Sequence, residues 1–61
     1  MQKYQVKAVI QSDLGSFQYY SRKIAESTFA LMQQQMGDIG FLKMFYVNRT
    51  GDMKLIAEVR K

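Results

Sequence analysis

The stretch Gly40–Val47 constrains the fold more than any other part of the chain, because it places apolar side chains on both sides of a strand. Successive side chains of a strand point to opposite faces of the sheet. An antiparallel strand with one wet face alternates polar with apolar residues, and after the glycine only Lys43 interrupts the apolar run. Both faces of this strand therefore need a cover. A helix of the same chain can supply one, and a partner molecule or a second copy of the chain must supply the other.

The segments around this stretch predict an α+β domain. Tyr4–Gln11 alternates apolar with polar residues, and an aromatic-rich segment, Ser16–Arg22, follows it after a turn, which indicates a hairpin. A last alternating segment, Asp52–Arg60, forms a second hairpin with the 40–47 strand. With a helix between the hairpins, the predicted order is β-β-α-β-β: an antiparallel sheet with one helix packed on one face.

The helix is predicted between Arg22 and Met36. Ser21 precedes it as the favoured N-cap, and Gly37 is a natural terminator in the left-handed conformation. The apolar residues within it recur at spacings of four, three and four, which places them on one stripe facing the sheet. The residues of this stripe are Ala25, Phe29, Met32 and Met36.

The turn Asn48–Gly51 leaves two registers open for the second hairpin. Asn-x-x-Gly is typical of a type I turn followed by a glycine bulge, which pairs Val47 with Met53. The outer face would then hold Leu42, Met44, Tyr46, Lys54, Ile56 and Glu58. A four-residue loop would instead slip the pairing by one residue and invert the strand's faces. The outer face would then hold Phe41, Lys43, Phe45 and Ile56. We favour the glycine bulge, and both registers leave large apolar side chains on the outer face.

An exposed apolar patch bordered by polar groups marks an interaction site. We expect a protein partner there, or a homodimer joined sheet to sheet, and the two can coexist. The residues predicted for this partner or dimer surface are Leu42, Met44, Tyr46, Ile56, Lys54 and Tyr20.

Composition narrows the classes of function. The 61 residues form a single domain, residues 1–61, and contain neither cysteine nor histidine, which removes disulfides, thiol nucleophiles and nearly every zinc or iron site. The five carboxylates show no spacing that suggests acid–base catalysis, and the four glycines form no phosphate-binding loop. We therefore expect no enzyme activity, cofactor or metal. No apolar run approaches the roughly 20 residues that span a bilayer, so we expect a cytoplasmic protein without a membrane anchor.

The formal net charge of +4 favours a negatively charged partner, although an excess of this size also serves solubility. An alternative function is therefore a small nucleic-acid-binding module, in which sheet aromatics stack on bases and basic side chains contact phosphates. The residues available for that role are Lys7, Arg22, Lys43, Phe45, Arg49 and Arg60.

Residues 11–20, Gln-Ser-Asp-Leu-Gly-Ser-Phe-Gln-Tyr-Tyr, resemble the small phage-encoded inhibitors of uracil-DNA glycosylase, which have a similar hairpin ending in a Tyr-Tyr pair. Those inhibitors are acidic and imitate DNA, whereas this chain is basic, so the resemblance leaves the target open. In layout the chain also looks like small phage-encoded anti-CRISPR proteins. Both resemblances imply a non-enzymatic phage or mobile-element protein that blocks a host or defence enzyme by steric occlusion in the host cytoplasm.

Overall fold

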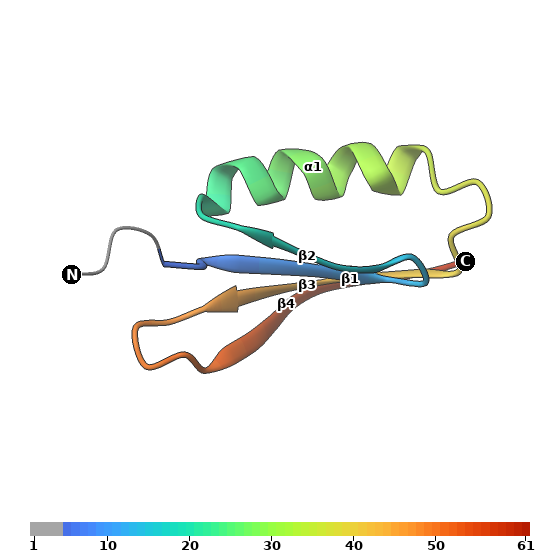
Figure 1. Ribbon diagram of the computed structural model, residues 1–61. Coiled ribbons are helices and arrows are strands. Elements are labelled where there is room, and N and C mark those ends of the chain that lie inside the picture. The colour runs from blue at the N-terminus through green and yellow to red at the C-terminus, as the bar shows by residue number, and fades with distance from the viewer. Residues whose placement is uncertain (1–4) are drawn as a thin grey trace.

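A computed structural model describes residues 5–61 and shows one antiparallel sheet with a single helix lying across one of its faces (Figure 1). The order β-β-α-β-β confirms the α+β class expected from the sequence. The elements are β1 (Ala8–Ser12), β2 (Gly15–Tyr19), α1 (Arg22–Gln34), β3 (Phe41–Val47) and β4 (Met53–Arg60). The first strand begins later than predicted, and Tyr4 lies outside the described residues.

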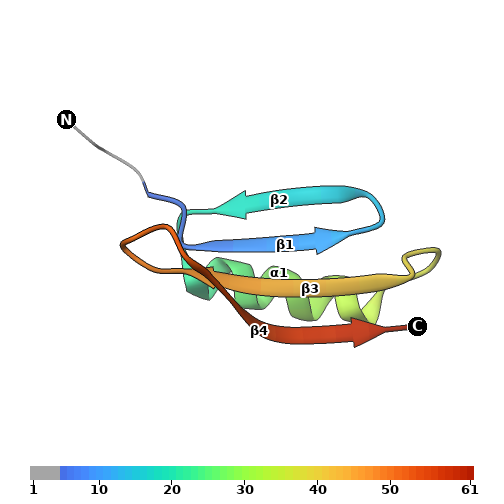
Figure 2. The same cartoon turned by 90° about the horizontal axis from the view of Figure 1, so that it is seen from below.

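The strands lie in the order β2-β1-β3-β4, and all neighbours run antiparallel, so β1 and β3 are central and β2 and β4 are the edges (Figure 2).

In the first turn the Ser12 hydroxyl accepts a hydrogen bond from the Leu14 N–H at 3.0 Å, and Gly15 takes a φ of 129° that favours glycine. The pairing of β1 with β3 brings the start of one strand to the end of the other. Accordingly, the Val47 N–H donates to the Lys7 carbonyl at 2.9 Å.

The helix begins where the sequence predicts it. The Ser21 hydroxyl accepts a hydrogen bond from the Ile24 N–H at 3.3 Å, which caps the first turn. The predicted stripe faces the sheet, since Ala25 and Phe29 are buried and Met32 and Met36 are partly buried against them. Within the described residues, no helix has both the length and the apolar character needed to cross a membrane.

The core lies between α1 and the sheet. Ala8 and Ile10 of β1 pair with Tyr46 and Met44 of β3, so these four side chains share the helix-facing side of the sheet. The buried apolar residues of this core cluster are Ala8, Ile10, Ala25, Phe29, Leu42 and Met44.

The β3–β4 hairpin follows the predicted glycine-bulge register next to its turn. The Gly51 N–H donates to the Asn48 carbonyl, the Asn48 N–H donates to the Asp52 carbonyl, and both distances are 3.0 Å. Val47 therefore pairs with Met53. A second bulge lies between Met44 and Phe45, opposite the additional residue Ile56, and beyond it the register shifts by one residue. β4 bends along its length, as Figure 2 shows.

The favoured assignment of faces on β3 is wrong, and the alternative assignment, with Phe41, Lys43 and Phe45 on the outer face, is the one observed. Leu42 is fully buried and Met44 is 5% exposed, both beneath α1, and Tyr46 lies on the same side. Hence Phe41, Lys43, Phe45 and Val47 are the side chains on the face away from the helix. The turn fixes how β3 pairs with β4 as far as the bulge but does not determine which face α1 covers. Both faces of β3 are apolar, so either could pack against the helix. The additional residue Ile56 determines which β4 side chains lie on each face. Before it, Leu55 lies beside Phe45 on the open side; after it, Ala57 and Val59 lie beside Met44 and Leu42 on the helix side.

Candidate functional site

The face of the sheet away from α1 is the first candidate site, and we call it the open sheet face. Figure 1 shows α1 on one side of the sheet and no described element on the other. Side chains alternate between the two faces along a strand, so the residues of β3 and β4 that flank the buried ones belong to the open sheet face. These are Phe41, Lys43, Phe45 and Val47 on β3 and Met53, Leu55, Glu58 and Arg60 on β4.

Apolar side chains form a continuous strip on this face. Phe45 pairs with Leu55 and Val47 pairs with Met53, so the four side chains lie beside one another across two strands. Leu55 is 46% exposed and Met53 is 47% exposed, whereas the Phe45 and Val47 side chains are partly buried. On the other side of β3, Val9 of β1 pairs with Phe45 and extends the strip toward the sheet centre. Val9 itself is only 8% exposed, so the apolar surface that solvent reaches lies on β3 and β4.

The charged groups of the open sheet face lie at one end of this strip. The Lys43 amine lies 5.6 Å from the centre of the Phe41 ring, over its face. The Arg60 guanidinium forms an ion pair with the Glu58 carboxylate at 2.8 Å. Within the described strands, Glu58 is the acidic residue of this face, so Lys43 leaves the border with an excess of positive charge.

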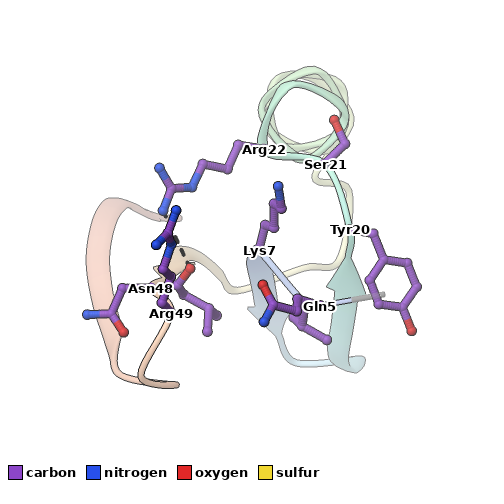
Figure 3. A pocket seen from close by; sticks show the side chains of 9 residues that line it. Gln5, Lys7, Tyr20, Ser21, Arg22, Asn48 and Arg49 are labelled. Atoms are coloured by element: carbon purple, nitrogen blue, oxygen red, sulfur yellow. Dashed lines mark hydrogen bonds between the residues drawn. The ribbon is translucent and has the colours of Figure 1, made fainter. Parts of the chain in front are cut away.

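A pocket of about 520 Å³ is the second candidate site and lies at the end of the sheet where α1 begins (Figure 3). Three basic residues line it: Lys7 before β1, Arg22 at the start of α1 and Arg49 in the β3–β4 turn. We call it the basic pocket. Figure 3 shows the Lys7 amine directed toward the start of the helix and the Arg22 side chain directed toward the turn that carries Arg49. The remaining lining residues are uncharged: Gln5, Val6, Tyr20, Ser21, Val47 and Asn48.

Arg22 is held in place by contacts with the end of β3. Its guanidinium carbon lies 4.5 Å from the centre of the Tyr46 ring, and its Nη2 donates to the Val47 carbonyl at 3.4 Å. The Tyr46 hydroxyl in turn donates a hydrogen bond to the Glu26 carboxylate. That hydrogen bond is the main reason why the pKa of Tyr46 is raised above its usual value, while the charge of Arg22 acts in the opposite direction.

The structure separates the residues predicted for a partner or dimer surface. Leu42 and Met44 belong to the core and cannot line an outer patch. Tyr46 and its pairing partner Lys54 lie on the helix side, and Ile56 at the bulge lines a hollow with Arg22 and Tyr46 there. Tyr20 lines the basic pocket. The sheet does have an apolar outer face, but its residues differ from the predicted set and are Phe41, Phe45, Val47, Met53 and Leu55.

The residues predicted for nucleic-acid binding fall into two groups. Lys7, Arg22 and Arg49 meet at the basic pocket, whereas Lys43, Phe45 and Arg60 belong to the open sheet face. Sequence reasoning did not bring the first three together, because they belong to three different elements. The order of the strands is what joins them, and no local pattern carries it.

Four of the five carboxylates have structural partners. Asp13 accepts a hydrogen bond from the Gly40 N–H at 2.8 Å, Asp52 lies 3.0 Å from the Thr50 hydroxyl, and Glu26 and Glu58 bond as described above. Across residues 5–61, no three acidic side chains gather as a metal-binding group. These contacts place the four carboxylates in turns and in surface hydrogen bonds.

Comparison with known protein families, with curated proteins and with solved structures finds no match. The likeness to phage inhibitors therefore rests on the hairpin residues and the layout alone.

Proposed function

We propose that the chain is a non-enzymatic binding protein that docks its open sheet face on an apolar patch of a target protein and blocks the target by steric occlusion. The observation that carries this proposal is the exposed apolar strip formed by Phe45, Val47, Met53 and Leu55. A half-exposed aliphatic side chain that becomes buried at an interface contributes about 25 cal/mol for each Å² removed from water. A contiguous strip gains more than the same side chains scattered over the surface, because one partner surface can cover it.

The charges of the open sheet face indicate the chemistry of the target. Lys43 and the Arg60–Glu58 pair border the apolar strip, so the border carries a net positive charge. A target with acidic groups around an apolar patch complements that border and is attracted over a longer range than the apolar contact itself. A second copy stacked with its strands parallel to those of the first would instead bring two positive borders together. Lys54, which could have met Glu58 of a second copy across the face, lies on the helix side.

The resemblance of residues 11–20 to phage-encoded inhibitors supplies the biological setting of the proposal. In that setting the target is a host or defence enzyme of a bacterium, and the place of action is the bacterial cytoplasm. A small domain without enzymatic chemistry acts there by covering a surface that the enzyme needs.

Affinity capture from a bacterial lysate with matched variants tests the proposal. Leu55→Lys places a charge in the apolar strip, whereas Leu31→Lys places the same charge on the exposed surface of α1, where Leu31 is 59% exposed. We expect the wild-type protein and Leu31→Lys to retain one bacterial protein at stoichiometric yield and Leu55→Lys to lose it. Recovery of no protein by the wild type, or equal recovery by both variants, would contradict docking through the open sheet face.

Nucleic-acid binding is the second candidate function, and one observation favours it. Phe41 and Phe45 lie on the same face of β3, and Lys43 between them lies over the Phe41 ring, as in a surface that stacks bases and holds phosphates. Binding to single- and double-stranded oligonucleotides at low salt tests it. A bound oligonucleotide must show an affinity that falls as salt rises, since counterion release contributes to any phosphate contact. Absence of binding at low salt, or binding without that dependence, excludes this candidate.

A further inference from the structure

The basic pocket has a composition that packing of the fold does not require. Three cationic side chains line it and no carboxylate does. Among the described residues, the Lys7 and Arg49 side chains have no hydrogen bond or ion pair of their own. Like charges that share a pocket repel one another, so this arrangement is unfavourable until an anion joins it. We propose that the basic pocket binds the dianionic phosphate group of a small phosphomonoester or of inorganic phosphate.

The start of α1, which contributes Arg22 to the pocket, also supports the proposal. A helix N-terminus carries a partial positive charge, so acidic residues are favoured in the first turn and basic residues are disfavoured. Here Arg22 and Lys23 occupy the first two positions, and the first turn contains no acidic residue. The sequence thus breaks a local rule of helix stability where the three cations meet. Such departures from local rules are expected at functional sites.

The backbone positions of all three basic residues are fixed by the fold. The Lys7 N–H donates to the Tyr19 carbonyl at 2.8 Å and its carbonyl accepts from Val47, so this residue is anchored to both neighbouring strands. Arg49 follows Asn48 in a turn closed by the Gly51 hydrogen bond. Arg22 is held by the Tyr46 ring and the Val47 carbonyl, which use one of its faces and one of its donors. A guanidinium carries five N–H donors, so Arg22 keeps donors for a ligand.

The charge and size of the pocket select the ligand class. Three cations offer more positive charge than the single negative charge of a phosphodiester requires, whereas a terminal phosphate carries about −1.5 to −2 at pH 7. A volume of about 520 Å³ lies within the range of small-molecule sites, about 300–1,000 Å³, and exceeds the space that a phosphate group alone occupies. The phosphate can therefore belong to a nucleotide, to the 5′ end of a strand or to the free ion.

Titration of the full chain with inorganic phosphate, followed by amide NMR shifts at low ionic strength, tests the site. We expect the shifts to concentrate at Ser21, Arg22, Asn48 and Arg49, and the melting temperature to rise with phosphate because the ligand binds the folded state. Arg49→Gln, in an exposed turn, should weaken phosphate binding about tenfold, as the loss of one hydrogen bond to a charged group does. Lys43→Gln is the matched control, since it removes one positive charge from the open sheet face and should change phosphate affinity less than about twofold.

Three ligands then distinguish the sources of the phosphate group. Adenosine monophosphate and a short 5′-phosphorylated oligonucleotide are compared with the same oligonucleotide carrying a 5′-hydroxyl. Binding of the phosphorylated forms alone supports the proposal and shows which source is preferred. Equal binding of both oligonucleotides, equal weakening by Arg49→Gln and Lys43→Gln, or shifts centred on Phe41 and Lys43 would overturn it, because each result indicates general attraction to a basic surface. Arg22→Lys keeps the charge and should retain part of the affinity that Arg22→Gln loses.

Discussion

The carboxylate of Asp13 accepts a hydrogen bond from the backbone N–H of Gly40 at 2.8 Å, which joins the β1–β2 turn to the residue that precedes β3. The approach is close enough that a Cβ atom at position 40 would lie 2.8 Å from the same carboxylate oxygen. A side chain at position 40 would therefore displace the Asp13 carboxylate, whereas Gly15 and Gly51 have positive φ angles. The contact helps to align β1 with β3, the central pair of the sheet.

Removal of this contact should lower stability. We expect Asp13→Ala to reduce the free energy of unfolding by about 1 kcal/mol, the usual net contribution of one hydrogen bond. Gly40→Ala should destabilise the wild type but cost less in the Asp13→Ala background, because the oxygen that the new methyl group meets is then absent. Urea denaturation of the two single variants and the double variant measures both effects. Additive losses would show that the two positions do not interact.

Phe29 should be the most costly helix residue to truncate. Its side chain is 6% exposed at the centre of the contact between α1 and the sheet, so Phe29→Ala should cost about 3–5 kcal/mol. A loss of that size is comparable to the whole stability of a domain of this length. Leu31→Ala is the control, since Leu31 is exposed and its truncation should cost well under about 1 kcal/mol. Thermal melting of both variants decides, and cooperative unfolding of Phe29→Ala close to the wild-type temperature would contradict the helix packing.

The Tyr46–Glu26 hydrogen bond should make stability depend on alkaline pH. The pKa of Tyr46 is raised in the folded state, so the folded protein holds this proton more tightly than the unfolded chain does. The contribution is fully present below the unfolded pKa of about 10 and is lost as the pH rises through the higher folded pKa. Tyr46→Phe should remove this part of the decline. Denaturation of wild type and variant at a series of pH values between about 8 and 11 measures it, and parallel curves would exclude the mechanism.

Self-association through the outer face of the sheet, expected from the sequence, stays a prediction. The charged border of the open sheet face should make this self-association depend on salt concentration. Two copies stacked with parallel strands would bring their Lys43 and Arg60 borders together, so self-association in this arrangement should strengthen at about 1 M salt, where charges are screened within about 3 Å. Binding of an acidic target should weaken under the same conditions. Sedimentation at micromolar concentration distinguishes a dimer from a monomer near 7.1 kDa. Leu55→Lys should abolish a dimer and Leu31→Lys should not. A monomer at every salt concentration would contradict self-association and would mean that a target protein, not a second copy, covers the open sheet face.

Local interactions determined much of this protein from the sequence alone. The N-cap at Ser21, the core stripe through Phe29 and the glycine-bulge turn after Val47 each depend on residues within a few positions of one another. Periodicity and turn chemistry therefore predicted them correctly. The doubly apolar character of β3 likewise indicated an uncovered apolar face.

Only the tertiary structure decided which face that is. Both faces of β3 are apolar, so the choice depends on how α1 and β1 pack together and on the additional residue Ile56 in β4. A shift of one residue inverts the side chains of a strand, and the turn controls the register only as far as the bulge. The basic pocket has the same origin. Lys7, Arg22 and Arg49 meet because β1 and β3 lie together at the sheet centre and α1 begins above their shared end, a juxtaposition of distant segments that no local pattern encodes.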